Sequence, residues 1–139
     1  MPETAPYAAA LLRIAQGVLF LAHGAVLKLG TFGLAGTMGY FASIGYPAGL
    51  GAVVIAAEVL GGLALIAGLA TRWVSLALVP LMLGAMLQHT GNGWVFSATG
   101  GGWEYPAFWT AALLAQAGLG AGAWALDGAR APARRSAIA

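Results

Sequence analysis

Long apolar runs separated by short polar or glycine-rich segments are the clearest pattern along this chain. Four such runs lie at about 7–28, 47–70, 72–89 and 106–126. A helix rises about 1.5 Å per residue, so each run is long enough to cross a hydrocarbon core of about 30 Å. No run alternates apolar and polar residues as a transmembrane strand does. The pattern predicts an all-α polytopic membrane protein, a bundle of four transmembrane helices in a single domain over residues 1–139.

The connections between the runs predict the orientation of the bundle. Two long connections, about 29–46 and 90–105, lie on one side, and a very short turn containing Arg72 lies on the other. The tail 127–139 shares the side of Arg72 and carries three more arginines, Arg130, Arg134 and Arg135. Because Lys and Arg are enriched on the cytoplasmic side, we expect both termini in the cytoplasm, two external loops, and a bacterial cytoplasmic (inner) membrane location.

Composition narrows the class of protein further. The chain is 60% hydrophobic and only 7% charged, which excludes a soluble globular enzyme and a disordered chain. It has no cysteine, so it cannot form disulfides or thiolate metal sites by itself. The net charge of +2 gives no reason to expect a nucleic-acid partner. The lipid bilayer is the partner that the composition predicts.

Polar residues inside the runs are the candidates for a site, because an ionisable group within a bilayer costs roughly 2.5–3.5 kcal/mol and usually faces the bundle interior. Arg13, Gln16 and His23 fall within an arc of about 80° on the first helix, and Lys28 follows at its external end. Glu58 is the only charge in the second run. We therefore expect each of these side chains to face other helices, except that Arg13, near the cytoplasmic end, is expected to snorkel toward water.

Depth along the helices predicts where the candidates meet. His23, Lys28 and Glu58 lie in the external half, His89 closes the third run, and Glu104 lies just before the fourth. We expect Glu58, His23 and His89 to point into one externally opening cavity, with Lys28 or Glu104 at its mouth. Structural interpretations stay open beside this one: Arg13 and Lys28 as interface anchors, and the two histidines as a core residue and a solvated helix end.

The sequence does not favour a metal centre or a bound redox group. The stripe of Met82, Met86 and His89 is more typical of core packing than of a copper site. His23 and His89 differ in expected depth by about one helical turn, which disfavours them as a pair of haem ligands. No cofactor motif is present.

The order and spacing of these residues resemble the DoxX family of small four-helix membrane proteins over about residues 8–128. The residues that carry the resemblance are Arg13 with Gly17, His23-Gly24 and Lys28, then Gly45-Tyr46-Pro47, Glu58 with Gly61-Gly62, Gly68 to Arg72, His89, Gly102-Trp103-Glu104, and Gly118 to Asp127.

The resemblance implies a function that the residues alone do not. DoxX proteins are similar to the DoxD-type membrane subunit of thiosulfate:quinone oxidoreductase, and relatives are associated with redox and sulfur metabolism. This implies a redox-associated subunit that binds quinone and works with a redox or sulfur-metabolism partner protein. A non-catalytic assembly or chaperone-like subunit and a small-molecule or proton carrier are the alternatives. No catalytic motif decides whether the chain is an enzyme, and its oligomeric state, including a homo-oligomer, stays open.

Overall fold

The chain folds into helices joined by turns and one long loop. The computed structural model describes residues 3–130. Its elements, in chain order, are α1 (Ala5–Leu21), η1 (Ala22–Phe32), α2 (Gly33–Ser43), α3 (Ala48–Ala67), α4 (Thr71–His89), η2 (Thr90–Asn92), α5 (Glu104–Leu119) and α6 (Leu126–Arg130). No strand occurs among these residues. The predicted all-α class is confirmed.

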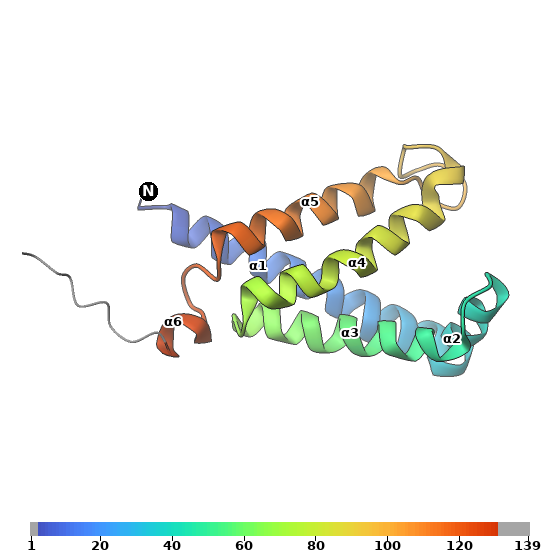
Figure 1. Cartoon of the computed structure of the whole chain (residues 1–139), viewed down its shortest axis with the longest axis horizontal. Coiled ribbons are helices and arrows are strands. Elements are labelled where there is room, and N and C mark those ends of the chain that lie inside the picture. Colours follow the sequence, from blue (N-terminus) through green and yellow to red (C-terminus); the bar gives the residue numbers. More distant parts are fainter. Residues whose placement is uncertain (1–2, 131–139) are drawn as a thin grey trace, which may run out of the picture.

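The longer helices run up and down along one axis (Figure 1). The first, formed by α1 and η1, packs most closely on α3, and α4 packs most closely on α5. We call the end where α1 begins and α3 finishes the Arg13 end. The opposite end, where η1 meets α2 and α4 runs into the loop 93–103, is the Lys28 end. The bundle thus has four helical arms, which are α1 with η1, α3, α4 and α5, and all four contribute residues to one interior.

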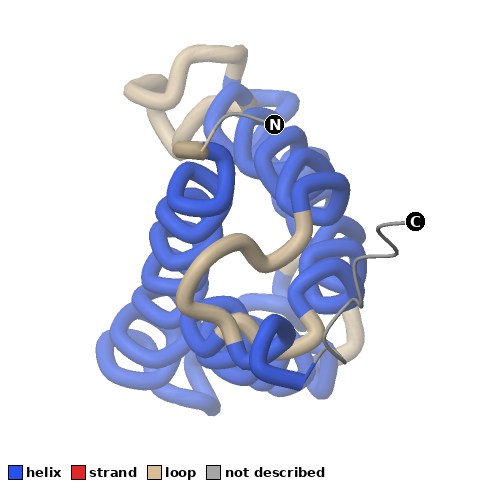
Figure 2. Tube along the Cα trace, turned by 90° about the vertical axis from the view of Figure 1, so that its left-hand side faces the viewer, coloured by secondary structure: helices blue, strands red, loops and turns tan. Residues whose placement is uncertain are grey.

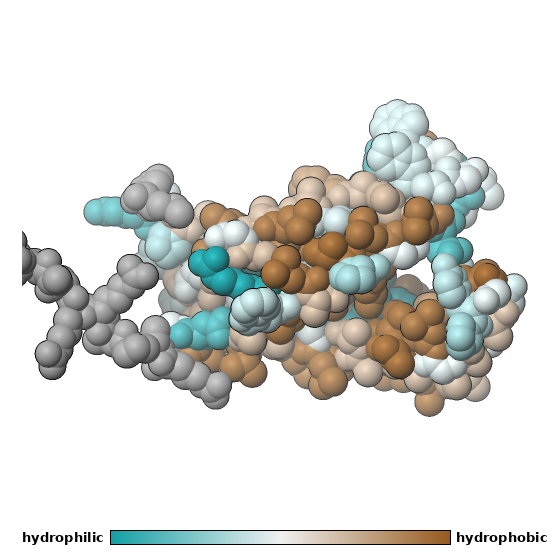
Figure 3. All heavy atoms as spheres, viewed as in Figure 1, coloured by the Kyte–Doolittle hydropathy of each residue, from teal (hydrophilic) through white to brown (hydrophobic). Residues whose placement is uncertain are grey.

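Many large apolar side chains lie on the surface of this protein, and several polar side chains are buried, which is unlike a soluble protein. Large apolar side chains such as Leu11, Leu60 and Phe108 are exposed, whereas polar side chains such as Gln16, Ser75 and Gln116 are buried. Apolar residues cover the middle of the visible face, and hydrophilic residues gather toward its two ends (Figure 3). Such a surface matches a lipid environment, in which apolar side chains face outward and polar groups bind one another inside.

Three helical stretches are long and apolar enough to cross a membrane: Ala5–Ser43, Ala48–Ala67 and Thr71–Asn92. The fourth arm, α5, has 16 residues, which corresponds to a length of about 24 Å. It differs from the predicted run 106–126 because the helix ends at Leu119, where Gly120 adopts a positive φ of 82°. The chain then crosses the Arg13 end of the bundle before α6 begins (Figure 2).

Other bounds differ less. The helical segment expected at 7–28 continues as η1 to Phe32, and the connection expected at 29–46 contains the helix α2. The predicted tail starts at 127, but Asp127 is bonded to the α3–α4 turn and belongs to the folded bundle. Arg134 and Arg135, on which the predicted orientation partly depends, lie outside the described residues.

Glycine allows the closest helix crossing in the bundle. A Cβ atom built on Gly17 of α1 would lie 2.8 Å from the backbone oxygen of Gly62 on α3, and one built on Gly62 would lie 2.8 Å from the oxygen of Gly17. A side chain at either position would force the two backbones apart. The contact places Arg13 and Gln16 of α1 beside the last turns of α3, and His23 and Lys28 beside its middle.

Candidate functional site

The segment η1 is a π-helix of 11 residues, and its geometry sets up the candidate site. In a π-helix the N–H group of residue i+5 bonds to the carbonyl oxygen of residue i, so residues five apart lie on nearly the same face. His23 and Lys28 are five apart. In an ordinary α-helix, at 100° per residue, the same two side chains would point about 140° away from each other. Sequence reasoning with α-helical spacing did not anticipate this segment.

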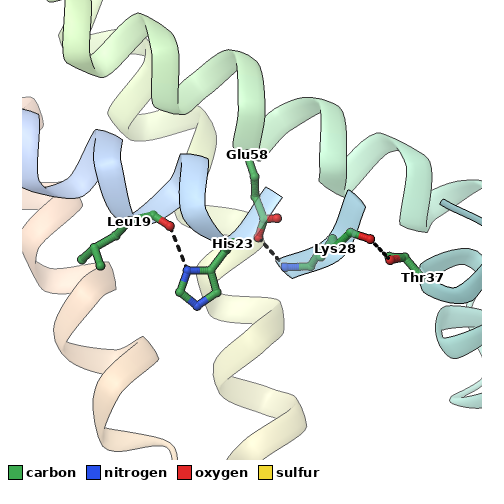
Figure 4. Close-up of polar contacts among 5 residues, drawn as sticks. All are labelled: Leu19, His23, Lys28, Thr37 and Glu58. Carbon is green, nitrogen blue, oxygen red and sulfur yellow. Dashed lines mark hydrogen bonds and ion pairs between the residues drawn. The ribbon is translucent and has the colours of Figure 1, made fainter. Parts of the chain in front are cut away.

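A buried ion pair lies at the centre of the site. Lys28 Nζ donates to Glu58 Oε1 over 2.9 Å, with the Glu58 side chain 5% exposed and that of Lys28 19% exposed. Gly24 permits the approach, since a Cβ there would lie 2.9 Å from the Cβ of Glu58. Figure 4 shows the Glu58 carboxylate reaching from α3 to the Lys28 amine on η1. The structure thus brings together two of the predicted site residues.

Helix α2 holds η1 in place through a residue that the sequence analysis missed. Thr37 Oγ1 donates to the backbone oxygen of Lys28 over 3.1 Å, and Thr37 is buried (Figure 4). A Cβ on Gly51 of α3 would meet the backbone of Met38 at 3.1 Å, so α2 packs tightly on the start of α3. A lone threonine in a glycine-rich connection carries no local signal for this role.

His23 lies beside the ion pair (Figure 4). Its Nδ1 lies 2.8 Å from the backbone oxygen of Leu19. A carbonyl oxygen only accepts, so Nδ1 carries the proton and Nε2 of the neutral ring is left as an acceptor. The other side of the imidazole faces Trp109 of α5, with ring centroids 5.3 Å apart.

Two polar atoms at this site are buried without a hydrogen-bond partner among residues 3–130. They are Glu58 Oε2, an acceptor, and Trp109 Nε1, a donor. An unsatisfied buried group costs roughly 1–3 kcal/mol. The membrane-spanning part of the bundle therefore contains a cluster of polar side chains, two of whose atoms could still form hydrogen bonds with a ligand. We call this cluster the Glu58 site; it consists of His23, Lys28, Glu58 and Trp109.

His89 and Glu104 fasten the loop 93–103 to the helix ends. His89 Nδ1 lies 3.1 Å and 3.2 Å from the backbone oxygens of Gly100 and Gly101. Glu104 Oε1 accepts from the backbone N–H of Phe96 over 3.3 Å. The hydrogen bonds of both side chains within the described part of the chain thus go to this loop, whereas Lys28 and Glu58 bond to each other.

Arg13 is fully buried on α1 and lies ten residues before His23, toward the Arg13 end of the bundle. Its guanidinium donates to five backbone oxygens at 2.7–3.2 Å, those of Leu65, Ile66, Ala121, Ala123 and Trp124. These oxygens belong to the end of α3 and to the segment that follows α5. The expectation that Arg13 snorkels toward water is wrong, because the carbonyl groups of two chain segments satisfy it inside.

Gln16 also lies away from the Glu58 site. Its Nε2 donates to Gln116 Oε1 over 3.3 Å, and Gln116 Nε2 in turn donates to the backbone oxygens of Ala9 and Gly120 at 3.2 Å and 2.8 Å. The seven candidates from the sequence therefore separate into three places. Lys28, Glu58 and His23 form the site, His89 and Glu104 hold a loop, and Arg13 and Gln16 organise the other end.

Asp127 completes the Arg13 end, and nothing in the local sequence pattern pointed to it. Its two carboxylate oxygens accept from the backbone N–H groups of Ala70 and Thr71 at 2.7 Å and 2.9 Å, at the start of α4. Desolvation by burial raises the pKa of Asp127, but the hydrogen bonds from Thr71 and Ala70 and the charge of Arg13 outweigh it and hold the pKa below its ordinary value of 3.8.

The lowered pKa of Asp127 gives a prediction for acid stability. A carboxylate with a depressed pKa stabilises the folded state fully above its unfolded pKa, and this contribution is lost as the pH falls through the folded pKa. We expect Asp127→Asn to lower the free energy of unfolding by about 1 kcal/mol at neutral pH. The difference from wild type should shrink steadily as the pH falls from about 5 to below 3.8. Thermal unfolding of both proteins across this range measures it, and a pH-independent difference would contradict the assignment.

An all-helical membrane protein with an apolar exterior and a buried Lys–Glu pair is the class that the fold and the site define. Within this class, the sequence model of the DoxX family matches residues 8–91, more than half of the chain, and the protein belongs to the DoxX family. The match includes His23, Lys28, Glu58 and His89. Neither the curated proteins nor the solved structures gave a match.

Proposed function

We propose that this DoxX protein is a quinone-linked, redox-associated membrane subunit that binds the quinone head group at the Glu58 site and works with a partner protein. The observation that carries the proposal is Glu58, which is buried and paired with Lys28 through Oε1, while Oε2 has no partner within residues 3–130. A buried ionisable group inside a membrane protein is a functional candidate because it is costly to keep there.

The donors and acceptors of the site suit an amphipathic ring. A quinone presents two carbonyl oxygens, which accept hydrogen bonds, and a quinol presents two hydroxyls, which donate them. Lys28 supplies donors, whereas Glu58 Oε2 and His23 Nε2 supply acceptors. The same groups can carry protons: reduction of the ring consumes two electrons, supplied by the partner protein, and two protons from water, and Glu58 and His23, once protonated, would pass those protons to the ring oxygens.

Electrons come from outside this chain in the proposal. A thiol or persulfide step requires cysteine, and the chain has none. The step therefore falls to a redox or sulfur-metabolism partner protein. The partially exposed Lys28 and the half-buried His23 mark the side from which a ring would approach Glu58. This side is the Lys28 end, which the proposal places toward the external face of a bacterial inner membrane.

A binding titration tests the proposed function. Purified protein in nanodiscs is titrated, without oxygen, with the quinol forms of a short-chain ubiquinone and a short-chain menaquinone, and binding is read by equilibrium dialysis. We expect Glu58→Gln to weaken binding at least tenfold, since glutamine keeps the shape but loses the charge that attracts a hydroxyl donor. Glu104→Gln, which alters a carboxylate that bonds only to a backbone N–H in the described structure, should bind as wild type does. Equal binding by wild type and Glu58→Gln, or no binding to wild type, would contradict the proposal.

The proposed orientation has its own test. Single cysteines introduced at Ser43 and Ser97 lie at exposed positions of the Lys28 end, in a chain without native cysteine. We expect both to react with a membrane-impermeant thiol reagent added to intact spheroplasts. A cysteine at Arg72, at the Arg13 end, should react only after the membrane is opened. The reverse pattern would place the termini outside the cytoplasm.

A further inference from the structure

A second buried polar layer lies between the Arg13 end and the core, and the proposed function does not use it. Along α4, steps of three and four residues lead from Met82 through Leu78 and Ser75 to Thr71, all buried. Along antiparallel α5, the corresponding buried steps lead from Trp109 through Leu113 to Gln116. The two series run side by side because Arg72 of α4 bonds to the oxygen of Ala117 on α5, over 3.3 Å. Leu78 and Leu113 belong to the same apolar core cluster, so Ser75 and Gln116, each three residues nearer the Arg13 end, lie at about the same level.

The first helix adds a third side to this layer. Gln16 of α1 donates to Gln116, so Gln16 and Gln116 lie together in the bundle interior, at the level at which Ser75 is buried on α4. We call these three residues the Gln16 layer. Toward the Glu58 site it is bounded by the fully buried apolar side chains of Phe20 and Leu113. The layer is therefore separate from the Glu58 site.

The Gln16 layer contains polar atoms that residues 3–130 do not satisfy. Gln16 Oε1 and Ser75 Oγ are both buried and have no hydrogen-bond partner there. Each such group costs roughly 1–3 kcal/mol when it stays unsatisfied, so a bound partner would stabilise the bundle.

The chemistry of these atoms selects the partner. Gln16 Oε1 can only accept, whereas the hydroxyl of Ser75 can donate or accept. The ligand must therefore donate at least one hydrogen bond. A cation is disfavoured, because the guanidinium of Arg13, a permanent positive charge, lies one turn away on the same face of α1. We propose that the Gln16 layer is a binding site for internal water, which donates to Gln16 Oε1 and bonds to the Ser75 hydroxyl.

Removal of one hydroxyl at a time tests the proposal. If water bridges the layer, Ser75→Ala removes one of its partners and should lower the melting temperature by about 3–6 °C. Thr110→Val is the matched control, since Thr110 is buried in α5 but its hydroxyl already donates to the backbone oxygen of Pro106 over 2.8 Å. We expect the control to shift by about 2 °C or less. If Ser75→Ala raises the melting temperature or leaves it unchanged, the layer is dry and the proposal is overturned.

A spectroscopic measurement on the wild-type protein does not depend on variant folding. Proton-detected solid-state NMR of glutamine-labelled protein in bilayers should show transfer from water to the side-chain amide of Gln16, and Ser75→Ala should weaken it. Gln88, which is exposed and bonds to the Tyr46 hydroxyl over 3.0 Å, serves as the solvent-exposed reference. Absence of transfer to Gln16 would overturn the proposal. So would stabilisation of wild type, but not of Ser75→Ala, by sodium at constant ionic strength, since that result would identify a cation.

Discussion

Arg13→Ala should be among the most destabilising single substitutions in this protein. The variant leaves five backbone oxygens at the Arg13 end without their donor; the bond to Leu65 is buried and the other four are partly buried. Removal of one side of a buried charged network typically costs about 3–5 kcal/mol. We expect a loss of this size in the free energy of unfolding, measured by denaturant or heat in nanodiscs, together with poor recovery from the membrane.

A second substitution at position 13 separates the effect of the positive charge from the effect of the guanidinium geometry. Arg13→Lys keeps the charge but replaces a planar fork of five donors with three donors on one atom, so it should recover only part of the lost stability. Arg72→Gln is the control, because Arg72 is exposed and makes one long bond to Ala117; we expect a change within about 0.5 kcal/mol. Equal stability of Arg13→Ala and Arg72→Gln would show that the buried network contributes nothing.

Lys28→Met should cost about as much as Arg13→Ala, for a different reason. It removes the partner of a carboxylate that is 5% exposed, and an unpaired buried charge typically costs about 3–5 kcal/mol. The double variant Lys28→Met/Glu58→Gln leaves no charge behind, so it should lie within about 1 kcal/mol of wild type. Unfolding in nanodiscs measures both, and together with Glu58→Gln and wild type they form a double-mutant cycle that gives the coupling between the two side chains.

Substitution of the other member of the ion pair should destabilise the protein less than Lys28→Met does. Glu58→Gln leaves Lys28, whose side chain is 19% exposed and whose flexible stem can carry the amine toward water. We therefore expect Glu58→Gln to be milder than Lys28→Met, which is why it is suited to the quinone titration. If Lys28→Met is as stable as wild type, Glu58 is not held by this pair and the Glu58 site loses its basis.

The sequence alone determined the class of this protein and the inward direction of its polar residues. Hydropathy over runs of about 20 residues predicts helices because a backbone in lipid must satisfy its own hydrogen bonds, and this physics needs no knowledge of tertiary contacts. The same argument marked Glu58 as a candidate site residue, since a lone carboxyl in a bilayer must be neutral, paired or wet; it did not choose among the three. The order of these residues also pointed to the DoxX family, which the family match confirmed.

Tertiary structure decided which partners the polar residues have. Arg13 binds the oxygens of segments 52 to 111 residues away in sequence, and backbone carbonyls, present in every residue, leave no mark in a sequence pattern. The same reason conceals Asp127, which accepts from two backbone N–H groups more than 50 residues away. Hydropathy states that a buried charge needs a partner, but not which partner.

The local geometry of η1 and the end of α5 also came from the structure. Spacing rules assume 100° per residue, and η1 departs from them as a π-helix, which is why His23 and Lys28 share a face that α-helical spacing denies them. Apolar composition continues past Leu119, so hydropathy extends the last run to 126, whereas the positive φ of Gly120 ends the helix and lets the chain cross to Arg13. Composition determines which residues avoid water. Only the packed backbone determines where a helix ends and which polar side chains lie on the same face of a helix.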